Sequence, residues 1–120
     1  MVHRRRSNPT VDDVRALALA LPRTTEALVR DQVKFRIGRI VYLALSRDET
    51  LLGFAFPRDE RDALIAAEPH KFLLPGGADL RYQWCVVRLA AIDRRELAEI
   101  VEDAWRMVVP KRVAAEHLGS

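Results

Sequence analysis

The sequence predicts an α+β fold in which an antiparallel sheet of about five strands carries an N-terminal, a middle and a C-terminal helix. Two stretches near the ends have helical periodicity, whereas the centre holds short, partly alternating apolar runs separated by polar turns. The length of 120 residues and the apolar fraction of 49% fit one domain with one core. We expect this domain at residues 10–113, between a flexible basic arm at 1–9 and a C-terminal tail at 114–120.

The first helix is predicted to begin after Thr10, which is a good N-cap, and to end at Pro22. Asp12 and Asp13 place negative charge in its first turn, where the helix dipole favours it. Its centre reads Ala-Leu-Ala-Leu-Ala and is apolar nearly all round. This composition favours deep packing against a sheet.

Four strands are then predicted as an antiparallel meander. A polar pair separates residues 26–30 from residues 33–37, which indicates a hairpin. A glycine bend leads to a third strand at 40–45, and a polar turn leads to a fourth at 50–56.

The middle helix is predicted between Pro57 and Pro69, with mixed charges, Arg61 among them, on its polar face. Residues 70–80 read as a loop that covers a corner of the core. Residues 82–89 read as the last strand.

The C-terminal helix begins with a capping-box pattern formed by Asp93 and Glu96, and Pro110 ends it. Apolar residues at helical spacing form its inner stripe, and acidic residues cover its outer surface. The basic pair Lys111-Arg112 follows, and a short turn is predicted at 113–117.

The sequence lacks the patterns of the common catalytic and metal-binding classes. Its five glycines form no phosphate-binding loop, and Cys85 is expected to be a small buried strand residue. No apolar run is long enough to span a bilayer, and no signal-peptide pattern follows the basic N-terminus. We therefore expect a cytoplasmic, monomeric and non-enzymatic protein without a cofactor or a metal.

Basic residues of the predicted hairpin are the first candidates for function. Lys34 and Arg36 share one face of the second strand, opposite its apolar residues, and Arg39 extends this basic stripe. Lys111 and Arg112 are further candidate phosphate contacts. The net charge of +3 and the pI of about 9.5 are compatible with a polyanionic partner such as DNA. A merely solvated sheet face would produce the same pattern.

Aromatic residues of the last predicted strand are the second candidates. Tyr82, Trp84 and Arg88 share one face of this strand, where an aromatic ring could stack a base or line a pocket. The alternative is that Trp84 packs in the core or at its rim.

Five segments of the chain, in their order and spacing, resemble the MmcQ/YjbR family over residues 10–113. They are Leu21-Pro22-Arg23-Thr24-Thr25-Glu26, Phe35-Arg36-Ile37-Gly38, Pro57-Arg58-Asp59-Glu60-Arg61-Asp62-Ala63-Leu64, Trp84-Cys85-Val86-Val87-Arg88-Leu89, and Ala104-Trp105-Arg106-Met107-Val108-Val109-Pro110-Lys111-Arg112. The resemblance implies a single frataxin-like (CyaY-like) α+β domain, and family members are usually labelled DNA-binding. The resemblance does not imply iron binding, because only Asp12 and Asp13 stand where a frataxin-like protein has an acidic ridge.

Two functions of different classes follow from these observations. The first is a DNA-binding protein that contacts phosphates through the basic hairpin without reading bases. The alternative is a small-ligand or protein-interaction module with a pocket near Tyr82 and Trp84. A continuous basic surface on the hairpin favours the first function, and ion pairs to Asp48, Glu49 or Glu60 favour the second.

Overall fold

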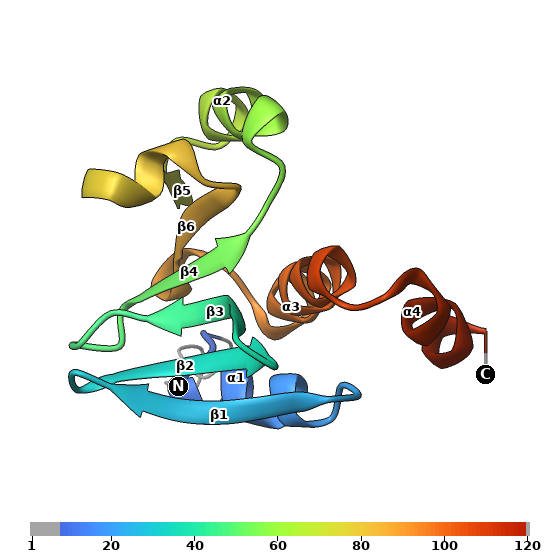
Figure 1. Ribbon diagram of the computed structural model, residues 1–120. Coiled ribbons are helices and arrows are strands. Elements are labelled where there is room, and N and C mark those ends of the chain that lie inside the picture. The colour runs from blue at the N-terminus through green and yellow to red at the C-terminus, as the bar shows by residue number, and fades with distance from the viewer. Residues whose placement is uncertain (1–7, 120) are drawn as a thin grey trace.

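A six-stranded antiparallel sheet forms the centre of the computed structural model, which describes residues 8–119 (Figure 1). The strand order is β1-β2-β3-β4-β6-β5. The strands are β1 (Thr24–Val29), β2 (Gln32–Ile37), β3 (Ile40–Leu45), β4 (Leu51–Ala55), β5 (Phe72–Leu73) and β6 (Trp84–Arg88). The helices are α1 (Val11–Leu19), α2 (Arg58–Ala67), α3 (Arg94–Val108) and α4 (Lys111–Leu118), with short 3₁₀ helices η2 (Gly77–Arg81) and η3 (Leu89–Ala91). The α+β prediction is confirmed, and residues 1–7 of the predicted arm lie outside the described residues.

Helices α1 and α3 cover one face of the sheet, which we call the covered face (Figure 1). Successive residues of a strand point to opposite faces, so each central strand contributes to both. The buried residues of the covered face include Phe35, Leu43, Leu45, Leu52, Phe54, Cys85 and Val87. The opposite side, which we call the open face, carries Lys34, Ala44, Gly53, Trp84 and Val86. The predicted alternation in β2 is therefore confirmed.

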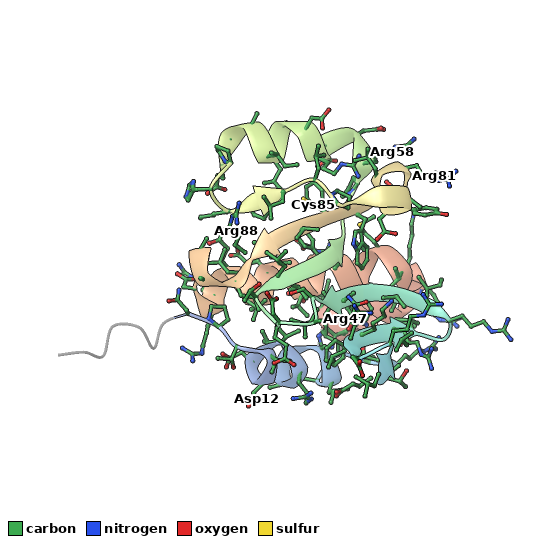
Figure 2. All side chains as sticks on the ribbon, turned by 90° about the vertical axis from the view of Figure 1, so that its left-hand side faces the viewer. Asp12, Arg47, Arg58, Arg81, Cys85 and Arg88 are labelled. Atoms are coloured by element: carbon green, nitrogen blue, oxygen red, sulfur yellow. The ribbon has the colours of Figure 1, made fainter. Side chains whose placement is uncertain are left out.

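Helix α2 packs against β5 and β6 at the other end of the molecule from α1 (Figure 2). It begins at Arg58 directly after Pro57, which fits the preference of proline for helix starts. Its inner residues Leu64 and Ile65 are partly buried against the core. Helix α2 therefore covers the β5–β6 end of the sheet, whereas α1 and α3 lie on the covered face.

The ends of α1 and α3 are fixed by the residues that the sequence indicated. The backbone N–H of Thr10 donates to Asp13 at 2.8 Å, which completes a capping box. The Asp93 carboxylate accepts the backbone N–H of Glu96 at 2.8 Å. The predicted inner stripe of α3 is confirmed, and its buried members are Leu97, Val101, Ala104 and Trp105.

A β-bulge in β3 places two consecutive side chains in the core. The pairing shifts between Phe35 and Arg36, so that Tyr42 has no partner across β2. Tyr42 and Leu43 are both fully buried, and the Tyr42 hydroxyl bonds to that of Thr24 at 2.7 Å. Burial raises the pKa of Tyr42 above its ordinary value.

Two segments differ from their predicted structure. Phe72–Leu73 forms a strand where a loop was predicted, because its pairing with β6 is long-range and two residues carry no periodic signal. The predicted turn at 113–117 lies within helix α4, which crosses the predicted domain end at 113. Pro110 ends α3 and also serves as the N-cap of α4. Val113 is buried, so α4 packs on the core.

Candidate functional site

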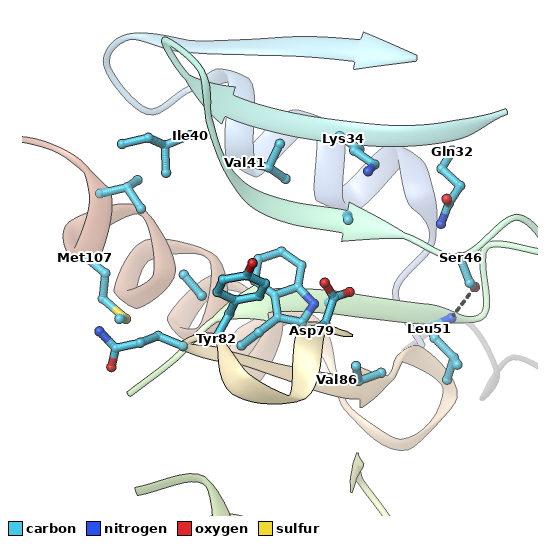
Figure 3. Close-up of a pocket in the computed structure, with 16 residues that line it drawn as sticks. Gln32, Lys34, Ile40, Val41, Ser46, Leu51, Asp79, Tyr82, Val86 and Met107 are labelled. Atoms are coloured by element: carbon cyan, nitrogen blue, oxygen red, sulfur yellow. Dashed lines mark hydrogen bonds between the residues drawn. The ribbon is translucent and has the colours of Figure 1, made fainter. Parts of the chain in front are cut away.

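The open face holds a trough with a volume of about 620 Å³ (Figure 3). Residues of β2, β3 and β4 line it, together with η2, the start of β6 and the end of α3. The volume lies within the range of small-molecule sites, roughly 300–1,000 Å³. The trough is therefore large enough to receive a ring system or an extended chain segment.

Small residues form the middle of the trough. Ala44, Gly53 and Ala55 line it on β3 and β4, and Ala44 is paired with Gly53. A β-carbon on Gly53 would lie 2.7 Å from Nε1 and 2.8 Å from Cζ2 of Trp84. The Trp84 indole therefore reaches from β6 across to β4, and this position requires glycine at residue 53.

The β2 wall of the trough carries an unpaired positive charge. Gln32 and Lys34 both line the trough, and the Gln32 amide donates to the carbonyl of Leu45 at 3.2 Å. Within residues 8–119, no hydrogen bond or ion pair joins the Lys34 ammonium group to another residue. The Lys34 ammonium is thus available to an anionic ligand.

Two further predicted cations lie near this wall. Arg36 is paired with Val41, which lines the trough, and Arg36 shares the open face with Lys34 by alternation. Arg39 is exposed in the β2–β3 turn, directly before Ile40 at one end of the trough. Neither arginine makes an ion pair within the described part of the chain. The predicted basic stripe therefore follows one side of the trough.

The acidic residues that could have neutralised the hairpin are used elsewhere or stand alone. Asp48 accepts hydrogen bonds from the hydroxyls of Ser46 and Thr50 at 2.7 and 2.8 Å within its own turn. These bonds hold the pKa of Asp48 below its ordinary value. Glu49 and Glu60 make no ion pair with the basic stripe in the described structure.

The opposite wall is formed by η2 and the start of β6. Asp79, Tyr82 and Gln83 line the trough from this side. The Tyr82 side chain is 56% exposed, and the Arg81 guanidinium lies 5.8 Å from its ring centre. No described donor bonds to the Asp79 carboxylate, so the trough contains one unpaired acid as well as Lys34.

Two arginines of α2 hold this wall in place. Arg61 is only 6% exposed, and its guanidinium donates to the carbonyls of Leu80 at 2.8 Å, Trp84 at 2.9 Å and Tyr82 at 3.3 Å. Its Nε has no partner among the described atoms. Arg61 therefore fixes the backbone on which the aromatic residues of the trough stand.

Arg58 adds a second anchor to the same wall. Its guanidinium donates to the backbone carbonyl of Arg81 at 2.6 Å, and Figure 2 labels both residues. Its backbone N–H donates to the Gln83 side chain at 3.2 Å.

The prediction that Arg61 lies on a polar helix face was wrong. The signal was present, because Leu64 and Ile65 follow Arg61 at the spacing of one helix face.

The structure brings together only some of the predicted site residues. Lys34, Tyr82 and Trp84 line one trough, although they were predicted in separate candidate sites. Arg88 is exposed and shares the face of Trp84 by alternation, but it does not line the trough. Lys111 and Arg112, the remaining candidates, are exposed in the first turn of α4 and do not line it either.

Cys85 lies on the covered face, between the open-face residues Trp84 and Val86. Burial raises the pKa of the Cys85 thiol, which keeps it protonated.

Among residues 8–119, no group of three or more His, Cys, Asp or Glu side chains could hold a metal ion. No helix in the same range is long and apolar enough to cross a membrane.

The comparisons with known proteins concern family and fold. The YjbR family model matches residues 19–107. A crystal structure of a Deinococcus radiodurans protein with a DUF419 domain has a similar fold, with a TM-score of 0.75 and 20% sequence identity. The similarity covers 94% of this chain and 90% of that chain. No curated protein matches the sequence.

Proposed function

Starting from the fact that the chain belongs to the YjbR family, we propose that it is a non-enzymatic DNA-binding protein whose open face holds a single strand. Lys34, Arg36 and Arg39 contact phosphates, and Tyr82 and Trp84 stack against bases. In this proposal the protein acts as a cytoplasmic monomer.

One observation carries the proposal: the unpaired Lys34 lines the same trough as Tyr82 and Trp84. Proteins that bind single strands combine a positive groove along the backbone with aromatic side chains that stack bases. The basic stripe supplies the first component, and the aromatic pair supplies the second. Lys111 and Arg112 are exposed and add further phosphate contacts outside the trough.

A single strand fits this geometry better than a duplex. Bases in a duplex are stacked and paired, whereas a single strand can turn a base away from its neighbours. The indole of Trp84 lies low over Gly53, so a base must leave the stack to reach it. Duplex DNA would touch only the exposed arginines at the rim.

The test is a salt titration of oligonucleotide binding, measured by fluorescence anisotropy. The logarithm of the affinity for single strands should fall linearly with the logarithm of the salt concentration, by about 0.7 for each phosphate neutralised. The double variant Lys34→Gln/Arg36→Gln should have a shallower slope, by about 0.7 for each phosphate that it no longer neutralises.

A matched control changes the same amount of charge outside the trough. Arg95 and Arg106 are exposed on α3, and neither lines the trough. The double variant Arg95→Gln/Arg106→Gln should keep the slope of the unmodified protein. An absence of binding at low salt, or equal reductions of the slope in both double variants, would refute the proposal.

The second candidate function is a small-ligand or protein-interaction module. The trough favours it, because a largely apolar concavity with a few convergent polar groups is typical of ligand sites. It predicts that a metabolite, rather than an oligonucleotide, raises the unfolding temperature. Thermal unfolding with both kinds of ligand therefore separates the two candidates.

A further inference from the structure

We propose that Asp79 makes the trough selective for guanine, by accepting hydrogen bonds from N1–H and the 2-amino group of an unstacked base. This inference rests on the proposed function and assigns a base preference to the same site. Tyr82 and Trp84 stack against the ring of this base, and Lys34 binds its phosphate.

The charges of the trough support a ligand that carries both an anionic group and hydrogen-bond donors. Lys34 extends from β2 and Asp79 from η2 toward the same space (Figure 3). No ion pair or hydrogen bond links them, so their charged groups are more than the bonding distance apart. A phosphate satisfies Lys34 and is repelled by Asp79. A ligand that spans both walls must therefore present donors to the carboxylate.

The chemistry of the bases narrows the choice to guanine. An ionised carboxylate has two acceptor oxygens and no donor, and it binds most strongly to two parallel donors. Guanine presents such a pair on its Watson–Crick edge. The amino groups of cytosine and adenine stand beside a ring nitrogen that is itself an acceptor, and thymine offers one N–H between two carbonyls. Single-stranded bases are commonly read on this edge.

Asp79 also belongs to the same wall of the trough as the two aromatic residues. Asp79 belongs to η2, three residues before Tyr82, and the backbone N–H of Tyr82 donates to the Asp79 carbonyl at 3.0 Å. Arg61 anchors the same segment through Leu80 and Trp84. Asp79, Tyr82 and Trp84 therefore belong to one segment of backbone, which Arg61 anchors.

The experiment compares short oligothymidines that differ in one central base: guanine, hypoxanthine, cytosine or thymine. We expect the guanine oligonucleotide to bind at least about tenfold more tightly than the all-thymine one, because charged hydrogen bonds are each worth about this factor. Hypoxanthine lacks the 2-amino group and should fall between them. In the Asp79→Asn protein the ratio of guanine to thymine affinity should fall several-fold, because the amide is uncharged and keeps only one acceptor oxygen.

The control is Asp62→Asn, which removes the same charge from an exposed position of α2 outside the trough. It should leave the ratio of guanine to thymine affinity unchanged. The Asp79 side chain bonds to no described group, so its replacement should not impair folding, and the thermal midpoint verifies this. Equal affinities for all four oligonucleotides, or an unchanged ratio in Asp79→Asn, would overturn the inference and leave the proposed function standing. An absence of binding to every oligonucleotide would overturn both.

Discussion

The two faces of the sheet are made by the same strands and differ in almost every physical respect. On the covered face Phe35 and Leu43 are paired and fully buried. On the open face their neighbours Lys34 and Ala44 are paired and line a trough. Alternate residues of one strand therefore serve stability on the covered face and the candidate function on the open face. Substitutions of adjacent residues can be compared to test this division.

The faces also differ in how their charges are paired. Near the covered side Arg15 pairs with Glu26 at 2.9 Å, and Lys71 pairs with Glu96 at 3.0 Å. Hydrogen bonds to Glu68 and Glu96 raise the pKa of Lys71. Lys34 on the open face has no such partner in the described structure. Unneutralised charge next to an aromatic trough is what distinguishes a candidate site from a solvated sheet face.

The largest effect is expected from the tryptophan of the covered face. Trp105 is fully buried, and its Nε1–H donates to the Pro22 carbonyl at 2.9 Å. Trp105→Ala should lower the free energy of unfolding by about 3–5 kcal/mol, because it leaves a cavity and an unpaired carbonyl. Urea unfolding followed by far-UV circular dichroism measures this decrease.

The tryptophan of the open face provides the comparison for this variant. Trp84 is only half-buried, so Trp84→Ala should lower the free energy of unfolding by less than Trp105→Ala and should weaken oligonucleotide binding. Trp105→Ala, measured where it remains folded, should bind the oligonucleotide normally. Equal decreases in stability would contradict the assignment of the two residues to different faces.

The next largest effect concerns the anchor of the trough wall. Arg61→Met retains much of the buried volume but removes the donors to three carbonyls. We expect the free energy of unfolding to fall by roughly 2–4 kcal/mol, since each buried carbonyl without a donor costs about 1–3 kcal/mol and water restores part of this. Amide hydrogen exchange should accelerate at residues 80–84 more than in β2 and β3. Uniform acceleration would show that Arg61 stabilises the whole fold rather than this wall.

A smaller effect is expected where the trough floor meets the indole. Gly53→Ala should cost about 1–2 kcal/mol, because the new methyl group would overlap Trp84. In a Trp84→Ala background the same substitution should be neutral or favourable, because alanine is the better strand residue. A double-mutant cycle with these two substitutions measures the coupling. Additive effects would mean that the indole does not rest on Gly53.

Local signals were sufficient to predict most of the fold. The capping residues Thr10 and Asp93 and the apolar stripe of the last helix are read from neighbouring positions along one helix. The meander of β1 to β4 follows from alternating runs and short turns. Strand β5 was missed because only its pairing with β6 makes it a strand, and α4 was missed because Pro110 was interpreted solely as a helix end.

The candidate site was predicted in parts but not as a whole. Alternation identified Lys34 and Trp84 separately, but their meeting depends on the register of four strands, which the sequence does not specify. Asp79 carried no signal, because an aspartate in a glycine-rich loop is typical of any turn. Arg61 looked solvent-exposed, because a buried arginine is rare and its partners are carbonyls distant in the sequence.

The smallest effect on stability is expected from Lys34, although its effect on binding should be large. Lys34→Gln breaks no ion pair or hydrogen bond in the described structure, so the free energy of unfolding should change by no more than about 0.5 kcal/mol. Phe35→Ala, one residue along the same strand, should cost about 3–5 kcal/mol. The two residues are neighbours in one strand, so the comparison tests whether the covered face carries the packing that stabilises the fold. A decrease above about 1 kcal/mol in Lys34→Gln would mean that Lys34 supports the fold, and the open face would then lack its main candidate for a dedicated anion contact.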